Sequence, residues 1–389
     1  MSLFRRMSYA ARVLPAYGWQ RLTRRGPDGH VHLIMALADH FEPAIDARGG
    51  AARVGRDEQT RRLELWCREY PQLAGAWRDH DGRPFVHSYF FPAEQYDEGL
   101  VQALADHCHA GWGEIEIHLH HGNPDPDTAQ NTRQLLTAFR DVLAFRHQCL
   151  AMETTSNTPR YAFVHGNFAL ANSAGGEFCG VDSEMSVLAQ TGCFADMTLP
   201  TAPLHPSQTA KINSLYECSI PLDRRAPQRR GRDLKVGRIP KVDPLIVQGP
   251  LLVDFGRKGR VGVENGSITK ANPLTVSRLK LWKKAAVQVE GRPDWLFIKL
   301  HCHSMAPSQK EAVLGEPMRR FLEELVQGAA ERNETLHFVS AREMVNIIHA
   351  ACEGREGNPN DYRDYKFRRI RDLASSAKSV DYPSADVRA

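Results

Sequence analysis

The sequence has neither a long apolar run nor a paired-cysteine motif. A membrane-spanning helix needs about 18 or more consecutive apolar residues, and no stretch of this chain approaches that length. The first 30 residues contain no compact apolar segment followed by small residues, so a secretory signal is not supported. The eight cysteines lie far apart without a C-x-x-C pair, which argues against a zinc ribbon or a disulfide framework. We therefore expect a cytoplasmic protein with free thiols.

The sequence also lacks several motifs that would define an enzyme class. There is no G-x-S-x-G elbow, no Walker loop and no G-x-G-x-x-G between a strand and a helix, which leaves serine hydrolases, P-loop proteins and dinucleotide-binding enzymes without support. The 50 Lys and Arg residues against 46 Asp and Glu give a net charge of only +4, so we expect no nucleic-acid partner. The hydrophobic fraction of 42% and the charged fraction of 25% are typical of a globular protein with a sizeable core.

Short apolar runs alternate with amphipathic helical segments along most of the chain. Strands are predicted at residues 31–38, 84–91, 114–120, 160–165, 194–199, 245–254, 295–301 and 335–339. Helices are predicted around residues 63–70, 135–143, 279–289 and 318–326, with a capping glycine at Gly192 and a capping box formed by Ser340 and Glu343. This order predicts an α/β fold, a distorted (β/α) barrel of seven or eight parallel strands over residues 31–352.

Three segments lie outside this pattern. Residues 1–30 form a basic amphipathic segment, and residues 1–25 either lie on an anionic membrane surface or form a helix packed on the domain. Residues 200–243 are a basic insertion, interpreted either as a flexible solvated loop or as a lid that binds an anion. Residues 353–389 are a polar tail that we expect to be partly disordered.

Seven of the seventeen histidines stand at the downstream ends of four predicted strands. In a parallel α/β barrel these ends share one rim, where side chains from distant segments converge. The seven are His40, His118, His120, His121, His165, His301 and His303. The other histidines outside this rim, among them His30, His32, His80, His107, His109, His147, His205, His337 and His349, are interpreted as structural.

The H-x-H spacing of His118 and His120 predicts a metal site. Residues two apart on a strand point to the same face, so both imidazoles can bind one ion, and Asp39 would add a carboxylate. Such a ligand set holds zinc or another divalent metal with a position open for water, which is typical of a hydrolase. Two alternatives remain: Asp39 could accept backbone N–H groups, and His165 with Asn167 could serve only to satisfy a turn.

Other polar residues near the rim carry weaker indications. Glu94 and His87 could reach the mouth, although an acid at a helix start and a structural histidine are the simpler interpretations. Asp196 and Thr198 share a face of the fifth strand, where they could support a metal ligand or bond to backbone.

The motifs together resemble the polysaccharide-deacetylase (NodB-homology) superfamily, in particular a divergent bacterial branch. They are ADHFEP at residues 38–43, EIEIHLHHGN at 114–123, YAFVHGN at 161–167, TGCFADMTLPTAP at 191–203, LFIKLHCH at 296–303 and LHFVSAREM at 336–344. The resemblance covers roughly residues 31–350. It implies a distorted (β/α) barrel carrying a metal-dependent amide hydrolase that removes acetyl groups from amino sugars.

The resemblance also implies roles for individual residues. Asp39 matches the catalytic base and His40 a metal ligand, while His118 with His120 or His121 matches the pair of histidine ligands. The motif at residues 300–303 matches the one that carries the leaving-group acid, which assigns His301 and His303 to catalysis. We assign substrate contacts to Glu42, His121, His165 and Asn167.

The chain departs from the family pattern at three motifs. Asp39-His40 replaces a pair of aspartates, the second histidine follows the first by two or three positions instead of four, and V-H-G-N replaces an arginine–proline motif. The prediction is a zinc-dependent deacetylase of an N-acetylated sugar, polysaccharide or precursor, acting in the cytoplasm or peripherally at the inner membrane. The alternative is a catalytically altered barrel that binds an anionic glycan or a lipid-linked sugar in envelope-polysaccharide assembly.

Overall fold

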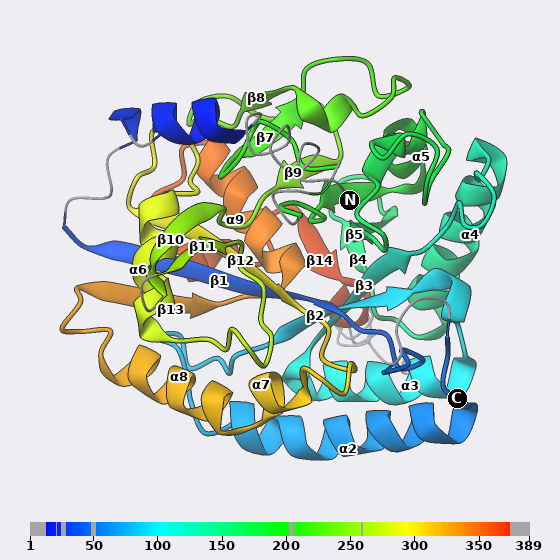
Figure 1. Cartoon of the computed structure of the whole chain (residues 1–389), viewed down its shortest axis with the longest axis horizontal. Helices are drawn as coiled ribbons and strands as arrows, with labels where there is room; N and C mark the ends of the chain where they lie inside the picture. Colours follow the sequence, from blue (N-terminus) through cyan, green and yellow to red (C-terminus); the bar gives the residue numbers. More distant parts are fainter. Residues whose placement is uncertain are drawn as a thin grey trace, which may run out of the picture.

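The centre of the molecule is a large, mostly parallel β-sheet with helices packed against it (Figure 1). The structure, a computed structural model, describes residues 13–20, 22–24, 29–47, 52–201, 205, 207–257 and 260–373. The parallel strands are β1 (Val31–His40), β2 (His87–Pro92), β3 (Gly113–Leu119), β5 (Pro159–His165), β6 (Cys193–Asp196), β9 (Leu245–Val247), β12 (Trp295–Cys302) and β13 (Glu334–Phe338). Each of these strands overlaps one of the eight predicted segments, so the α/β class and the parallel sheet are confirmed.

The remaining strands extend or flank this sheet. They are β4 (Ala151–Glu153), β7 (Leu215–Cys218), β8 (Gly231–Asp233), β10 (Leu252–Arg257), β11 (Arg260–Glu264) and β14 (Phe367–Arg369). The strand order is β12-β1-β2-β3-β5-β6-β9-β7-β8, with β13 also paired to β1. Within the described residues no strand pairing joins β9 to β12, so the hydrogen-bonded sheet does not close on itself.

The predicted strand at residues 245–254 divides into two strands of different sheets. β9 ends at Val247, and β10 pairs only with β11. Pro250 between them lacks a backbone donor, and Gly249 passes so close to β12 that a Cβ there would lie 2.4 Å from the carbonyl oxygen of Lys299. The chain therefore leaves the ladder at this point.

Helices cover the sheet where the sequence places apolar residues on one face. The helices are α2 (Arg56–Ala74), α3 (Glu98–His107), α4 (Ala129–Asp141), α5 (Glu184–Thr191), α6 (Val276–Ala285), α7 (Lys310–Leu314), α8 (Glu316–Gln327) and α9 (Ala341–Cys352). Short 3₁₀ or π turns are η1 (Ala93–Gln95), η2 (Cys108–Trp112), η3 (Val142–Arg146), η4 (Leu170–Asn172), η5 (Pro227–Arg229) and η6 (Pro359–Tyr362). Gly192 caps α5 in the left-handed conformation, and Ser340 with Glu343 forms the capping box of α9.

The two faces of β1 pack into different cores, which decides where each polar residue at its end lies. Leu33, Met35 and Leu37 join the core that includes α2, α3 and α8, which lie together along one side of the sheet in Figure 1. Ile34 and Ala36 join a second core with residues of β5, β6, β9, β12 and α9. Successive residues of a strand alternate between faces, so Asp39 belongs to the first face and His40 to the second.

The described part of the basic insertion at residues 200–243 contains two strands and several buried side chains. β7 and β8 form an antiparallel pair that extends the sheet beside β9. Arg225 donates to the carbonyl oxygen of Asn172, and Arg229 donates to that of Ser173. These arginines hold neighbouring backbone, which weakens the interpretation of the insertion as an anion-binding lid.

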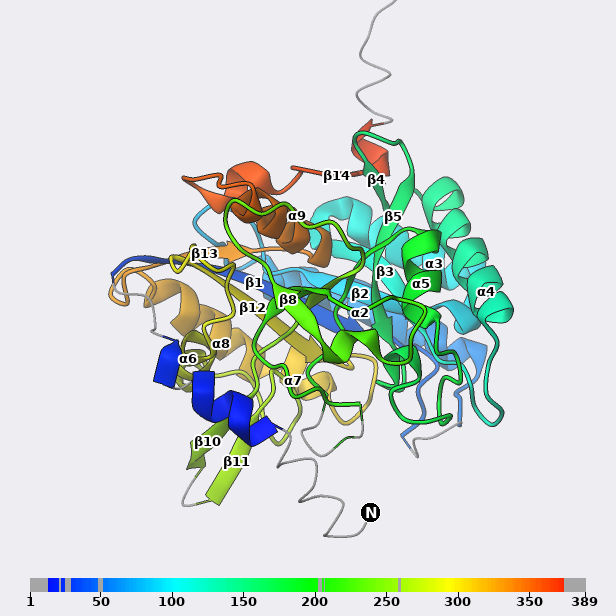
Figure 2. The ribbon, with the colours of Figure 1, turned by 90° about the horizontal axis from the view of Figure 1, so that it is seen from above.

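The chain beyond residue 352, the predicted end of the barrel domain, packs on the domain as far as residue 373. β14 pairs with β4, and the ring of Phe367 stacks on that of Phe194 with centroids 4.6 Å apart. Figure 2 shows β14 and α9 on the same side of the molecule. Residues 374–389, the end of the predicted tail, lie outside the described residues.

Candidate metal centre at the mouth of the sheet

The downstream ends of β1, β3 and β12 bring four histidines around one buried glutamate. We call Glu42, His40, His118, His120 and His303 the mouth cluster. Ligand atoms of Glu42, His118 and His120 lie within 4.8 Å of one another, and so do those of Glu42, His40 and His303. The predicted convergence of strand ends is confirmed for β1, β3 and β12.

Glu42 is the centre of the cluster because two imidazoles converge on one of its oxygens. The Nε2 atom of His118 lies 3.0 Å from Oε1 of Glu42, and the Nε2 atom of His120 lies 3.3 Å from the same oxygen. Two ligand atoms bound to one tetrahedral zinc lie roughly 3.3 Å apart. The spacing of the three residues therefore fits a shared divalent cation.

Hydrogen bonds on the far side of each ring fix which nitrogen faces Glu42. Nδ1 of His118 lies 2.8 Å from the carbonyl oxygen of Val164, and Nδ1 of His120 lies 2.8 Å from a carboxylate oxygen of Glu94. Both partners are acceptors, so each ring places its proton on Nδ1. The Nε2 lone pairs then face a carboxylate oxygen, an arrangement that requires either an additional proton on each ring or a cation between them.

His40 and His303 extend the cluster with nitrogens that lack partners. Their ring centroids lie 4.4 Å apart, and the ring of His40 lies 4.8 Å from that of His118. Within the described part of the chain, Nδ1 of His40 and Nδ1 of His303 are buried without a hydrogen-bond partner, and the same holds for Nδ1 of His301. Buried polar atoms without partners are uncommon in proteins and indicate a missing ligand, ion or water.

The electrostatics of the cluster favour a charged Glu42. Burial acts to raise the pKa of Glu42, but hydrogen bonds from His118 and His120 outweigh it and hold that pKa well below its usual range. Burial acts to lower the pKa of His120, but Glu42 and Glu94 together raise it to about 9. Burial, together with the imidazoles of His303 and His118, holds the pKa of His40 well below its usual range. At neutral pH the site thus holds an anionic Glu42, a neutral His40 and a protonated His120, and a cation that binds to His120 displaces that proton.

The prediction that Asp39 binds the metal with His118 and His120 is wrong. Oδ2 of Asp39 lies 2.9 Å from Nδ1 of His87, and Oδ1 accepts the backbone N–H of Ser304 at 2.9 Å. The aspartate points to the face packed on α2, whereas His40 and the other ligands point to the opposite face. Asp39 accepts a backbone N–H, as its alternative interpretation stated, and it anchors the loop that carries His303.

His121 and His165 do not line the mouth as predicted but belong to a second buried group. Their Nε2 atoms lie 3.2 Å apart, and His165 is fully buried. Nδ1 of His165 accepts the backbone N–H groups of Asn167 and Ala169, as expected if this ring satisfies the turn after β5. Asn167 is half-buried, and its assignment to substrate remains a prediction.

Residues with weaker indications separate into two groups. Glu94 reaches the mouth through His120, whereas His87 is buried against Asp39 as a structural histidine. Thr198 Oγ1 accepts the backbone N–H of His165, so this threonine supports the backbone of a rim histidine. His337 pairs with Asp81 at 2.6 Å, in agreement with its predicted structural role.

Sequence reasoning assigned Glu42 to the substrate, but the structure places its carboxylate between two imidazoles. The spacing itself contained a signal, because Glu42 follows His40 by two positions as His120 follows His118. Gly166 has a related role, since a Cβ there would lie 2.3 Å from the ring of His120. The glycine of the V-H-G-N motif therefore leaves room for a ligand.

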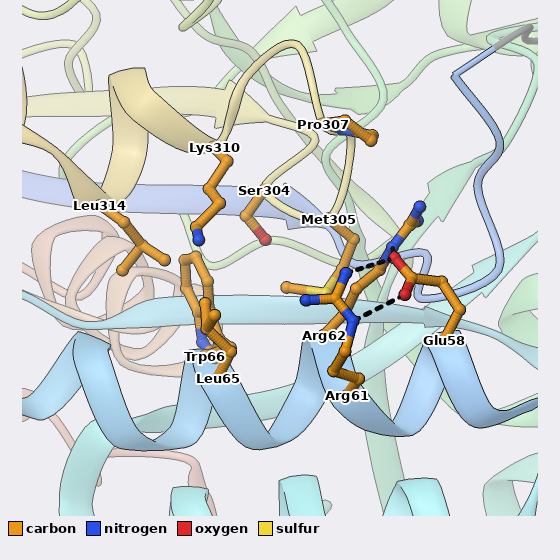
Figure 3. Close-up of a pocket in the computed structure, with 10 residues that line it drawn as sticks. All are labelled: Glu58, Arg61, Arg62, Leu65, Trp66, Ser304, Met305, Pro307, Lys310 and Leu314. Carbon is orange, nitrogen blue, oxygen red and sulfur yellow. Dashed lines mark hydrogen bonds and ion pairs between the residues drawn. The ribbon is translucent and has the colours of Figure 1, made fainter.

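A pocket lies beside the mouth, between α2 and the loop after β12 (Figure 3). It is lined by Glu58, Arg61, Arg62, Leu65, Trp66, Ser304, Met305, Pro307, Lys310 and Leu314. Arg61 and Arg62 both bind Glu58, and Arg62 also donates to the carbonyl oxygen of Ile45. Because these arginines already pair with groups of the protein itself, the mouth cluster is the better candidate for a catalytic site.

Comparisons with models of known protein families and with curated proteins find no match to this chain. Among the described residues, no helix is both long enough and apolar enough to cross a membrane.

Proposed function

We propose that the mouth cluster binds a divalent cation, zinc, and that the protein is a metal-dependent hydrolase of amide bonds. One observation carries this proposal: two imidazole Nε2 atoms, with their Nδ1 positions bound to acceptors, converge on one carboxylate oxygen of Glu42. Protein sites with two histidines and one carboxylate hold catalytic metals with an open position. A bound divalent cation would polarise an acyl carbonyl and make water nucleophilic at neutral pH.

The other residues of the mouth have roles that follow from their positions. Glu94 and the carbonyl of Val164 hold the two ligand rings in one tautomer, which is the usual support of a metal-binding histidine. His303 is half-buried and lies beside His40, so it is placed to exchange a proton with a substrate. Asp39 is a positioning residue, because it holds the backbone of Ser304 next to His303.

The proposed substrate is an N-acetylated sugar, polysaccharide or precursor. The order of motifs along the chain supports this substrate class. We also propose that the sheet is an open form of the distorted (β/α) barrel. Side chains of β1, β5, β6, β9 and β12 share one core with those of α9, so these strands lie around a common interior that the helix helps to fill. The alternative, a protein that only binds an anionic glycan, is less favoured because Arg225 and Arg229 bond to backbone.

The full-length protein should hold a metal and lose its activity when the metal is removed. We expect at least one equivalent of zinc by elemental analysis, and release of acetate from acetylated amino sugars that stops after chelation and returns with zinc. Measuring acetate release with and without chelator tests both parts. A protein without bound metal that takes up none on titration would contradict the proposal.

The segment before β1 has a surface suited to an anionic membrane. Residues 13–20 are helical, and Gln20 and Arg24 bond to the backbone of residues 212 and 213. This arrangement leaves Trp19 and Leu22 69% and 85% exposed. We propose that these apolar side chains enter the cytoplasmic surface of the membrane, because exposed tryptophan and leucine suit that interface and the sequence of residues 1–25 is basic.

Vesicle binding tests this contact. We expect the protein to sediment with phosphatidylglycerol vesicles, and the double change Trp19→Gln and Leu22→Gln to weaken binding at least about tenfold through the lost apolar burial. Ile239→Gln is the matched control, because Ile239 is 58% exposed outside this segment and should leave binding unchanged. Equal binding by both variants would contradict the assignment.

A further inference from the structure

A second group of metal-binding side chains lies beneath the loop that follows β5. It consists of His121 after β3, His165 at the end of β5, Cys179 in the loop at residues 166–183, and Glu184 at the start of α5. All four residues are buried, and their ligand atoms lie within 4.8 Å of one another. We call these four residues the buried cluster. It shares no residue with the mouth cluster.

Three of the four distances within the buried cluster are close to those in the coordination shell of one ion, and the fourth, between His121 and Glu184, is that of a hydrogen bond. Nε2 of His121 lies 2.8 Å from Oε1 of Glu184 and 3.2 Å from Nε2 of His165. Oε2 of Glu184 lies 3.6 Å from Sγ of Cys179, and Oε1 lies 3.7 Å from Nε2 of His165. Ligand atoms around a tetrahedral zinc are separated by roughly 3.3–3.8 Å, depending on whether sulfur is included. The four side chains of the buried cluster supply four ligand atoms, which would fill the coordination sphere of a tetrahedral zinc and leave no position for water or substrate.

His121 has the outer hydrogen bond that is typical of a metal-binding histidine. Its Nδ1 lies 2.8 Å from a carboxylate oxygen of Asp127, so this nitrogen carries the proton and Nε2 faces the cluster. Nδ1 of His165 instead accepts two backbone N–H groups at 3.3 Å. His165 must therefore change tautomer to bind an ion, and we assign it as the fourth ligand after His121, Cys179 and Glu184.

The charge of Glu184 supplies an independent argument. This carboxylate is fully buried, and within the described part of the chain its ion pairs are with His121 and His165 only. A buried carboxylate without an Arg or Lys partner requires another source of positive charge, either a protonated imidazole or a cation. The thiol of Cys179 beside these imidazoles and this carboxylate completes a set of side chains of the kind that binds zinc.

The geometry points to a structural zinc site formed by His121, His165, Cys179 and Glu184. One ion bound there connects the ends of β3 and β5 with the start of α5. It also fixes the loop at residues 166–183, in which Phe168, Ala171, Asn172 and Phe178 all have positive φ. The ring of Phe168 lies 5.5 Å from that of His40, so the second ion would hold an aromatic wall of the mouth in place. This inference does not depend on the proposed hydrolase activity.

Cobalt substitution distinguishes the two clusters because only the buried cluster contains a thiol. We expect the full-length apoprotein to bind two equivalents of Co²⁺ and to show thiolate-to-cobalt charge-transfer absorption in the near ultraviolet. Cys179→Ser should remove this absorption and one equivalent, while Glu42→Gln removes the other equivalent and leaves the absorption intact. A cobalt-loaded wild-type protein without thiolate absorption would overturn the assignment, and this measurement requires no variant to fold.

Cys302→Ser is the matched control. Cys302 is a buried thiol near Asp39 and His87, the third group of possible ligands in the described residues. The carboxylate of Asp39 is already bonded to His87 and to the backbone of Ser304, so we expect this variant to keep both equivalents and the thiolate absorption. Loss of the absorption in Cys302→Ser, with its retention in Cys179→Ser, would overturn the proposal. The metal content of Glu42→Gln reports on the mouth cluster separately.

Discussion

Glu42→Gln is expected to weaken metal binding at the mouth cluster by more than about 100-fold and to abolish metal-dependent hydrolysis. Changes in residues that only support a ligand cost about 10–100-fold, and removal of a ligand charge should exceed that range. Glutamine keeps the size of the side chain but replaces the anionic oxygen on which His118 and His120 converge. Titration of the apoprotein with zinc, together with acetate release, measures both effects.

Two neighbouring carboxylates provide graded controls for this experiment. Glu94→Gln removes the acceptor that orients His120 and should cost about 10–100-fold in affinity. Asp39→Asn changes a buried carboxylate on the other face of β1, and we expect affinity to stay within a few-fold of the wild type. If Asp39→Asn lost as much affinity as Glu42→Gln, the assignment of the ligands would be wrong.

The contrast between Asp39 and Glu42 shows what the sequence could not decide. Histidines at several strand ends predicted convergence, because parallel strands deliver their downstream ends to one edge. Because β1 is buried on both faces, its sequence shows no alternation of apolar and polar residues. The sequence therefore does not indicate which face of the strand carries Asp39 and which carries His40. A choice between adjacent residues therefore needed the register and packing of the folded sheet.

The buried cluster was beyond sequence reasoning for a different reason. His121 and His165 stood out at strand ends, but Cys179 lies in a loop without periodicity, far from any second cysteine. The backbone N–H of Asp127 donates to the carbonyl oxygen of Cys179 at 2.8 Å, and a Cβ at Gly122 would lie 2.3 Å from that oxygen. These tertiary contacts bring the thiol to the histidines, and no local pattern encodes them.

The packing of the chain beyond residue 352 could not be predicted from composition, because composition does not show which side chains are buried. Residues 353–373 are polar, yet Arg363 and Phe367 are buried against the body of the protein. The carbonyl oxygens of both residues accept hydrogen bonds from Arg342 of α9. The buried Arg342 thus connects β14 to α9. Its substitution is expected to have the largest effect on stability.

Arg342→Met is expected to destabilise the protein by about 3–5 kcal/mol. Arg342 is 2% exposed and binds Glu114 of β3 through Nε at 3.0 Å and Nη2 at 2.8 Å. Removing one member of a buried ion pair leaves the other charge without compensation, which costs about that amount. The burial of Glu114 and the loss of the hydrogen bonds to the carbonyl oxygens of Arg363 and Phe367 also lower the stability of this variant. The midpoint of urea unfolding, followed by circular dichroism, measures the change.

Arg320→Met is the matched control for this substitution. Arg320 approaches Glu316 at 3.8 Å with both side chains more than 60% exposed, so its loss should change stability by less than about 0.5 kcal/mol. Adding Glu114→Gln to Arg342→Met should recover part of the lost stability, because it removes the buried charge that Arg342 had compensated. If Arg342→Met unfolded at the same urea concentration as Arg320→Met, the buried pair would not hold the C-terminal strand to the sheet.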